Sequence, residues 1–129
     1  MTDLKNVMIV EDDPDIREIV TLALRGVGGL TVKACDSGRL ALKEVDGFAP
    51  QLILLDVMMP DMDGPETLAA LRLQGSVSGE TAVAFMTATV HPSELARYRE
   101  LGVTEVISKP FDPMTLADDA RAIWRRFND

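Results

Sequence analysis

The sequence predicts a doubly wound α/β fold, in which a five-stranded parallel sheet is covered by five helices on its two faces. Three observations support this prediction. Short apolar runs alternate with longer amphipathic segments, prolines stand where helices should begin, and glycines stand where they should end. Regular alternation of strands and helices is typical of a parallel sheet, because each strand must be reached by a crossover connection.

The expected strands are five short apolar runs. The third, LILL at 52–55, is apolar throughout and leads directly into a single acid, Asp56. A buried strand that ends in one charge places that charge at the edge of the sheet, where open α/β sheets bind ligands. The five expected strands are residues 7–10, 30–35, 52–55, 82–86 and 103–108.

The expected helices lie between these strands and after the last of them. The first helix should begin at Asp13-Pro14, the fourth at His91-Pro92 and the fifth at Asp112-Pro113, since proline is favoured at the first helical position. Four helices should stop near Gly26, Gly47, Gly75 and Gly102. Apolar residues recur at helical spacing at Ile16, Ile19, Val20 and Leu24, at Leu68 and Leu71, and at Leu116 and Ile123.

Length and composition predict one cytoplasmic domain, residues 1–129. The net charge of −8 and the few aromatic residues argue against nucleic acid as a ligand. The single cysteine, Cys35, excludes an internal disulfide and suits a reducing compartment. No apolar run is long enough for a membrane span, and the first residues lack the apolar core of a signal peptide.

Polar and charged residues follow four of the expected strands. Because the ends of parallel strands share one edge of the sheet, these side chains should converge there. A cluster of carboxylates repels itself unless cations lie among them. Lys109 supplies one cation, and a hard divalent ion such as Mg²⁺ would supply more. The residues concerned are Glu11, Asp12 and Asp13 after the first strand, Asp56 after the third, Thr87 after the fourth, where the small Ala88 follows it, and Lys109 after the fifth.

This arrangement predicts a phosphoryl-transfer site. Asp56 would act as the nucleophile, and Thr87 and Lys109 would stabilise the phosphoryl oxygens beside a magnesium ion. The small side chain of Ala88 would leave room for an incoming donor.

Four sequence segments make the prediction specific: VEDDP at 10–14, LLDVMMPDMDG at 54–64, MTA at 86–88 and SKPF at 108–111. Over nearly its whole length the chain resembles a response-regulator receiver domain of two-component signalling, of the stand-alone type. The resemblance implies the flavodoxin-like receiver fold with strand order 2-1-3-4-5.

The resemblance also implies roles for individual residues. Glu11 and Asp12 match the acidic pair that binds the metal, and Asp56 matches the phosphoacceptor, which also contacts the metal. Met58 matches the position that offers its backbone carbonyl to Mg²⁺.

Thr87 matches the hydroxyl residue that turns toward the phosphoryl group, and Lys109 matches the lysine of the family motif. The Lys109–Pro110 bond is the expected cis peptide. One departure is Val106, at a position where the family often has tyrosine or phenylalanine as a switch. A valine cannot act as such a gate, so another element, such as the loop after Thr87, would have to carry the signal.

The function implied is transfer of a phosphoryl group to Asp56 from a phosphohistidine on a sensor kinase or a histidine phosphotransfer domain. The chain would then switch contacts with a downstream protein and lose the phosphoryl group by slow self-dephosphorylation, without acting as an enzyme on foreign substrates. We expect Ile16 to be exposed and to contact the kinase, beside Ile19, Pro110 and Phe111. Because the sequence stops soon after the fifth helix, we expect no DNA-binding output domain.

Three other functions are compatible with a parallel sheet that carries acids at its edge. An aspartate-dependent phosphatase typically has two acids as Asp-x-Asp, whereas this chain has Asp56-Val57-Met58. A flavin or nucleotide site needs a Gly-rich or Ser/Thr-rich loop after the first strand, and the acids there repel phosphate. A pseudo-receiver, which binds a partner without being phosphorylated, is the remaining alternative.

Several conspicuous residues have simpler interpretations. Asp13 should cap a helix, and Asp61 and Asp63 should shape the turn before Gly64 rather than bind metal. His91 should be a loop residue at a helix start. Two apolar groups should serve packing: the methionines Met58, Met59 and Met62 in their loop, and Trp124 on the last helix.

Overall fold

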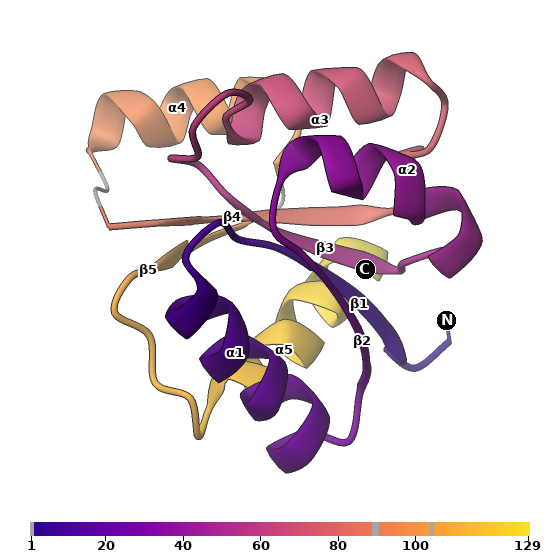
Figure 1. Cartoon of the computed structure of the whole chain (residues 1–129), viewed down its shortest axis with the longest axis vertical. Coiled ribbons are helices and arrows are strands. Elements are labelled where there is room, and N and C mark those ends of the chain that lie inside the picture. The colour runs from indigo at the N-terminus through magenta and orange to yellow at the C-terminus, as the bar shows by residue number, and fades with distance from the viewer. Residues whose placement is uncertain (1, 89–90, 104) are drawn as a thin grey trace.

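The computed structural model describes residues 2–88, 91–103 and 105–129 and contains the predicted parallel sheet. The strand order is β2-β1-β3-β4-β5, as predicted (Figure 1). Every strand pair is parallel, which confirms the predicted kind of sheet. The strands are β1 (Asn6–Val10), β2 (Thr31–Cys35), β3 (Leu52–Asp56), β4 (Ala82–Thr87) and β5 (Glu105–Ser108).

Helices cover both faces of the sheet, as expected for a doubly wound fold. Figure 1 shows α1 and α5 on one face and α2, α3 and α4 on the other. The helices are α1 (Pro14–Leu22), α2 (Gly38–Phe48), α3 (Gly64–Leu73), α4 (Pro92–Glu100) and α5 (Leu116–Asn128), and a π-helical turn, η1 (Ala23–Val27), continues α1.

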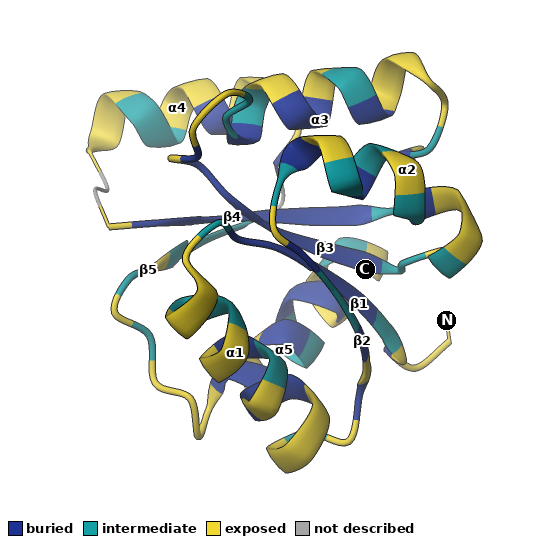
Figure 2. Cartoon of the chain, viewed as in Figure 1, coloured by how far each residue is buried: buried dark blue, intermediate teal, exposed yellow. Residues whose placement is uncertain are grey.

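The sheet separates two apolar cores. Alternate residues of each central strand point to opposite faces, so Ile9 and Leu54 pack with α1 and α5, whereas Met8 and Ile53 pack with α2 and α3. All five residues of β3 are buried, and Figure 2 shows the central strands as the most deeply buried part of the chain. The site at the end of β3 is therefore mounted on deeply buried strand backbone.

The strand boundaries differ slightly from the prediction. Strands β3 and β4 each run one residue further than expected, so Asp56 and Thr87 are their last residues. The fifth strand is shorter than expected, since Val103 precedes it and residue 104 lies outside the described residues. The extension matters most, because it places both side chains on hydrogen-bonded strand backbone.

Two of the three predicted helix starts are confirmed. Asp13 caps α1, its carboxylate accepting from the backbone N–H groups of Asp15 and Ile16, and Pro92 opens α4. The prediction for Asp112-Pro113 is wrong, because α5 begins at Leu116. Asp112 instead accepts a hydrogen bond from the backbone N–H of Met114, which closes a turn. An aspartate before proline favours such a turn as readily as a helix cap.

Two of the four predicted helix ends are confirmed. Gly75 and Gly102 follow α3 and α4 with φ values of 80° and 79°, which glycine adopts without strain. The predictions for Gly26 and Gly47 are wrong. Gly26 lies inside η1, and α2 continues past Gly47 until Ala49 takes the left-handed conformation at φ 54°.

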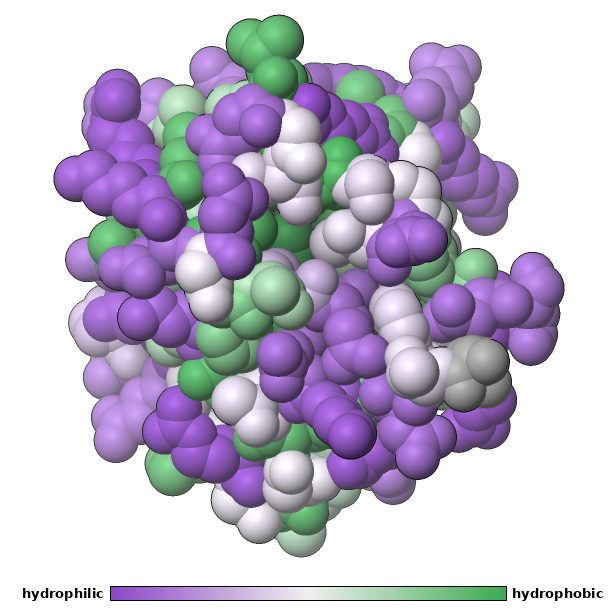
Figure 3. All heavy atoms as spheres, turned by 90° about the vertical axis from the view of Figure 1, so that its right-hand side faces the viewer, coloured by the Kyte–Doolittle hydropathy of each residue, from purple (hydrophilic) through white to green (hydrophobic). Residues whose placement is uncertain are grey.

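The face of the molecule shown in Figure 3 is mainly hydrophilic, with apolar side chains scattered among charged ones.

Three further expectations from the sequence concern Cys35, Trp124 and membrane spans. Cys35 is buried and unpaired, and burial raises the pKa of its thiol to about 11, which leaves it unreactive. Trp124 lies in the apolar core as predicted. No helix in the described part of the chain has the length and apolar character needed to span a bilayer.

Candidate functional site

The predicted site residues converge at the carboxyl edge of the sheet. Glu11 directly follows β1, and Lys109 directly follows β5. Backbone hydrogen bonds continue the sheet at these points, since the Glu11 N–H donates to the Cys35 carbonyl at 3.0 Å and the Lys109 N–H to the Thr87 carbonyl at 2.9 Å. The side chains at this edge are thus carried on fixed backbone.

Lys109 lies between two buried carboxylates. Its Nζ atom donates to Glu11 Oε1 at 2.5 Å and to Asp56 Oδ1 at 3.0 Å. The Glu11 residue is fully buried and Asp56 is 3% exposed. Buried acids of this kind are tolerated only when a cation and hydrogen bonds accompany them, and Lys109 supplies both to these two carboxylates.

Three acids form a candidate metal site. Glu11, Asp12 and Asp56 each offer a carboxylate oxygen, and these atoms all lie within 4.8 Å of one another. Oxygen ligands from a few carboxylates are the chemistry that suits Mg²⁺. The donor set therefore fits the predicted ion.

The neighbouring aspartates have structural roles, although only Asp13 has the capping role predicted for it, and Asp63 caps a helix where it was expected to shape the turn before Gly64. Besides Asp13 at the start of α1, Asp63 caps α3 through a reciprocal pair of hydrogen bonds with Glu66. Asp61 forms an exposed ion pair with Arg39. Among the described residues, none of these three aspartates belongs to the acidic cluster.

The ionisation of Glu11 reflects its surroundings. Burial first, and then a hydrogen bond with Asp56, raise the pKa of Glu11 from 4.5 to about 7, although Lys109 opposes them. Burial alone would lower the pKa of Lys109, but its hydrogen bonds to Glu11 and Asp56 outweigh burial and raise it. Lys109 is therefore charged throughout the physiological range, whereas Glu11 titrates within it.

We expect the metal-free protein to lose stability as pH rises from 5 to 8. A carboxyl group whose pKa is higher in the folded state stabilises the fold fully below its unfolded pKa of 4.5, and this contribution disappears as pH rises through about 7. The loss attributable to Glu11 is at most about 3 kcal/mol. Urea unfolding in EDTA at pH 5 and pH 8 measures it.

Glu11→Gln is the control for this pH dependence, because it keeps the shape of the side chain and removes the titration. The difference in the free energy of unfolding between pH 5 and pH 8 should shrink in this variant. An identical pH dependence in both proteins would contradict the assignment to Glu11.

The other predicted site residues lie around this centre. Thr87 is buried at the end of β4, and Ala88 after it is exposed. Met58 has a side chain that is 76% exposed, whereas Met59 is buried, so packing in the loop accounts for only part of the methionine cluster. The Lys109–Pro110 bond is cis, as predicted.

Val106 stands where the family often has an aromatic switch residue. Val106 is half-buried and packs against the core on the side of α3 and α4. The loop after Thr87, which we expected to carry the signal instead, includes residues 89 and 90, and these lie outside the described residues.

An apolar hollow of about 390 Å³ opens beside Lys109. The expectation that Ile16 is exposed is wrong, because Ile16 is half-buried and packs partly against the core, while Ile19 is 45% exposed. The hollow is lined by Ile16, Ile19, Ala88, Lys109, Pro110, Phe111 and Pro113.

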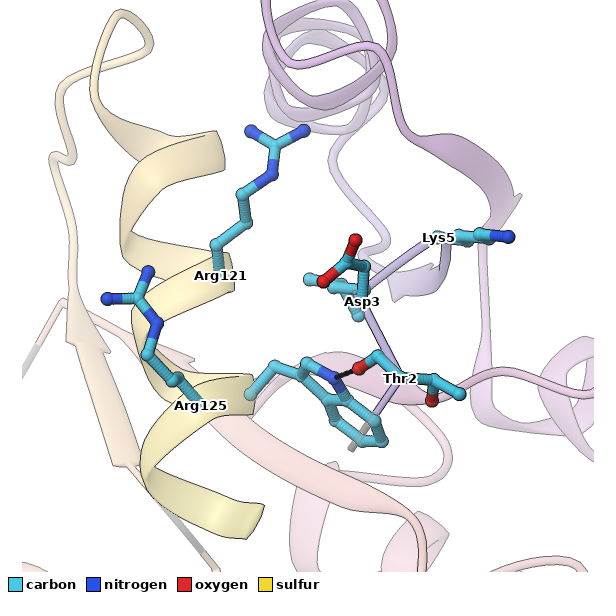
Figure 4. Close-up of a pocket in the computed structure, with 7 residues that line it drawn as sticks. Thr2, Asp3, Lys5, Arg121 and Arg125 are labelled. Atoms are coloured by element: carbon cyan, nitrogen blue, oxygen red, sulfur yellow. Dashed lines mark hydrogen bonds between the residues drawn. The ribbon is translucent and has the colours of Figure 1, made fainter. Parts of the chain in front are cut away.

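A second hollow of about 470 Å³ lies near the opposite end of β1, between the first residues of the chain and α5. Figure 4 shows that Lys5, Arg121 and Arg125 point in different directions, so their charges do not converge on a common ligand. The indole of Trp124 donates to the Thr2 carbonyl at 2.7 Å, which ties the chain's start to α5.

Two further residues contact the site and are not predicted by the sequence. Arg17 on α1 donates to the backbone carbonyls of Glu11 and Asp12. Gly64 lies against the backbone of Asp56, where a Cβ atom would come within 2.7 Å of the Asp56 carbonyl oxygen. No feature of the sequence indicates the Arg17 contact. The position of Gly64 after the acidic turn indicates only where that turn ends.

Comparison with known families and sequences gives one consistent result. The family described as "Response regulator receiver domain" matches residues 7–121. The chain is 34% identical over 125 residues to the DNA-binding response regulator MtrA of Mycolicibacterium smegmatis, covering 97% of this chain and 53% of MtrA. It is 34% identical over 127 residues to the transcriptional regulatory protein CseB of Streptomyces coelicolor, covering 98% and 52% respectively. The chain thus spans about half the length of these relatives.

Solved structures agree with the sequence comparison. The chemotaxis protein CheY4 of Vibrio cholerae superposes with a TM-score of 0.85 at 29% identity, covering 93% of this chain and 98% of that one. The receiver domain of DrrB, solved in a BeF₃-activated form, gives a TM-score of 0.79 at 26% identity. The match covers 95% of this chain and 99% of the DrrB chain.

Proposed function

Because the chain belongs to the response regulator receiver domain family, we propose that it is a phosphoacceptor switch in which Asp56 receives a phosphoryl group. The observation that carries this proposal is the buried Asp56 at the end of β3, hydrogen bonded to Lys109 and within reach of two further acids. A nucleophile on rigid backbone, with a cation and a candidate metal site beside it, is what in-line phosphoryl transfer requires.

The chemistry follows from these groups. An oxygen of Asp56 attacks the phosphorus of a phosphohistidine, a P–O bond forms, and the P–N bond breaks with its electron pair returning to the imidazole ring. Glu11, Asp12, Asp56 and the carbonyl of Met58 would hold Mg²⁺, which when bound neutralises charge on the phosphoryl oxygens. Lys109 exchanges its contact with the carboxylate for one with the new phosphoryl group.

The output is a change in surface rather than a released product. Aspartyl phosphate adds charge and acceptor oxygens at the edge of the sheet. Thr87 and Lys109 turn toward these oxygens, and the shift passes to the surface around α4 and β5. The phosphoryl group is lost slowly by hydrolysis at the same site, and no foreign phosphoester is turned over.

The partners we propose are a sensor histidine kinase or a histidine phosphotransfer domain on the input side, and a protein target on the output side, all in the cytoplasm. The apolar hollow beside Lys109 suits the input partner, because it lies next to the acceptor and exposes Ile19. The net charge of −8 disfavours direct contact between these residues and nucleic acid.

Incubation with acetyl phosphate tests the proposal. We expect the intact mass to rise by one phosphoryl group when Mg²⁺ is present, and not in EDTA. Asp56→Asn should abolish the gain, whereas Asp61→Asn, which changes an exposed aspartate of the same loop, should retain it. A folded native protein that gains no mass in any condition would contradict the proposal and favour a pseudo-receiver.

A further inference from the structure

Arg17 lies in the first turns of α1, behind the acidic end of β1. Its Nη1 atom donates to the backbone carbonyl of Glu11 at 3.0 Å and to that of Asp12 at 3.3 Å. The side chain is half-buried. A single guanidinium nitrogen thus contacts two successive carbonyls directly beside the acidic cluster.

These two contacts restrict the backbone on both sides of one residue. The Glu11 carbonyl belongs to the peptide plane before the Cα atom of Asp12, and the Asp12 carbonyl belongs to the plane after it. Because each peptide unit is planar, holding both carbonyls restrains both backbone dihedrals of Asp12. The direction of its Cα–Cβ bond is restrained as well, and with it the side from which its carboxylate reaches the cluster.

Other bonds in the same turn support this restraint. The Asp13 N–H lies 3.4 Å from Glu11 Oε2, and the Arg17 N–H donates to the Asp13 carbonyl at 2.9 Å. Arg17 is therefore anchored by the helix whose cap is part of the acidic turn. Asp12 itself sits at the more open side of the cluster, since it is half-exposed whereas Glu11 and Asp56 are buried.

We propose that Arg17 is a positioning residue for the metal site: it holds the turn after β1 so that the carboxylates of Glu11 and Asp12 face Asp56. This inference rests on the proposed magnesium site and adds to it the residue that sets its geometry. Groups that orient metal ligands from outside typically change metal affinity by about 10- to 100-fold when they are replaced.

The positioning role and a simple charge effect predict opposite results. Arg17 carries a positive charge close to the proposed ion, so removing that charge alone would strengthen Mg²⁺ binding. Removing an orienting contact would weaken it. The sign of the change in Mg²⁺ affinity therefore distinguishes the positioning role from the charge effect.

Isothermal titration with Mg²⁺ in the absence of a phosphoryl donor is the test. We expect Arg17→Ala to weaken binding about tenfold. Arg17→Lys, which keeps the charge and one donor group, should recover part of the loss. Arg17→Gln, which keeps a donor without the charge, should bind more tightly than Arg17→Ala but more weakly than the native protein. The Asp12 and Asp13 amides should exchange hydrogen faster in Arg17→Ala.

Arg25→Ala is the matched control, because Arg25 also donates to a backbone carbonyl, that of Val32, but away from the acidic cluster. Its Mg²⁺ affinity should equal that of the native protein. Equal or tighter binding by all three Arg17 variants would overturn the inference while leaving the magnesium site intact. Absence of Mg²⁺ binding by the native protein would instead overturn the proposed site.

Discussion

Replacing Gly64 with alanine should destabilise the protein by about 2–3 kcal/mol and slow the uptake of a phosphoryl group by Asp56. A Cβ atom at Gly64 would lie 2.7 Å from the carbonyl oxygen of Asp56 and 2.9 Å from the Cα atom of Val57. Both neighbours are backbone atoms, so the clash cannot be relieved by rotating a side chain. The Gly64 N–H also donates to the Val57 carbonyl at 2.9 Å, which holds α3 against this strand end.

Relief of this clash requires one of two movements. Either α3 moves away from the end of β3, or the backbone that carries Asp56 shifts. Urea unfolding followed by the fluorescence of Trp124 measures the loss of stability. The rate of mass gain with acetyl phosphate, in a sample shown to be folded, measures the slower phosphoryl uptake by Asp56.

Gly47→Ala is the matched control. Gly47 lies inside α2, and nothing lies within 4 Å of a Cβ atom built there. Alanine should therefore stabilise the helix by about 0.5–1 kcal/mol and leave phosphoryl uptake unchanged. Equal stability of Gly64→Ala and the native protein would show that stability does not require the close approach of α3 to the backbone of Asp56.

The fold was predictable because the sequence repeats one pattern five times. The strands were recognisable as apolar runs, and the order of β1 and β3 at the centre followed from the family resemblance. The errors concern helix ends, where competing local solutions have similar energy. Gly47 carried the usual signal for a helix end, but Ala49 adopts the left-handed conformation instead. Asp112-Pro113 carried the signal for a start, but a turn uses the same residues.

The site was predictable to the extent that its residues follow strands. Glu11, Asp56 and Lys109 converge because parallel strands end at one edge, and this argument needs only the order of elements. The contacts of Arg17 and Gly64 depend on the packing of a helix against a strand end. Helical spacing does not specify such packing, and the same uncertainty explains why the exposure of Ile16 was predicted wrongly.

Lys109→Met should destabilise the metal-free protein at pH 8 by about 3 kcal/mol or more. The substitution keeps most of the apolar stem but removes the ammonium group that lies between Glu11 and Asp56. Two buried carboxylates would then face each other without a cation. Loss of one partner from a buried ion pair is costly because the remaining charge has neither water nor a counterion.

Two conditions should rescue this variant. At pH 5 the defect should shrink, because the pKa of Glu11 is already raised to about 7 in the native protein and loss of Lys109, which lowers it, would raise it further. At pH 8 added Mg²⁺ should restore more stability to the variant than to the native protein, because the ion replaces the missing charge. Urea unfolding at both pH values, with EDTA or Mg²⁺, measures both effects.

Lys33→Met is the control for the loss of a lysine. Lys33 pairs with Glu44 at 3.6 Å, and both side chains are about 40% exposed. An exposed pair of this kind contributes less than about 1 kcal/mol, and its loss should show no special response to Mg²⁺. If the two lysine variants were equally stable at pH 8 without metal, the carboxylates at the sheet edge would not depend on Lys109. The acceptor would then have to be held in place by its backbone alone.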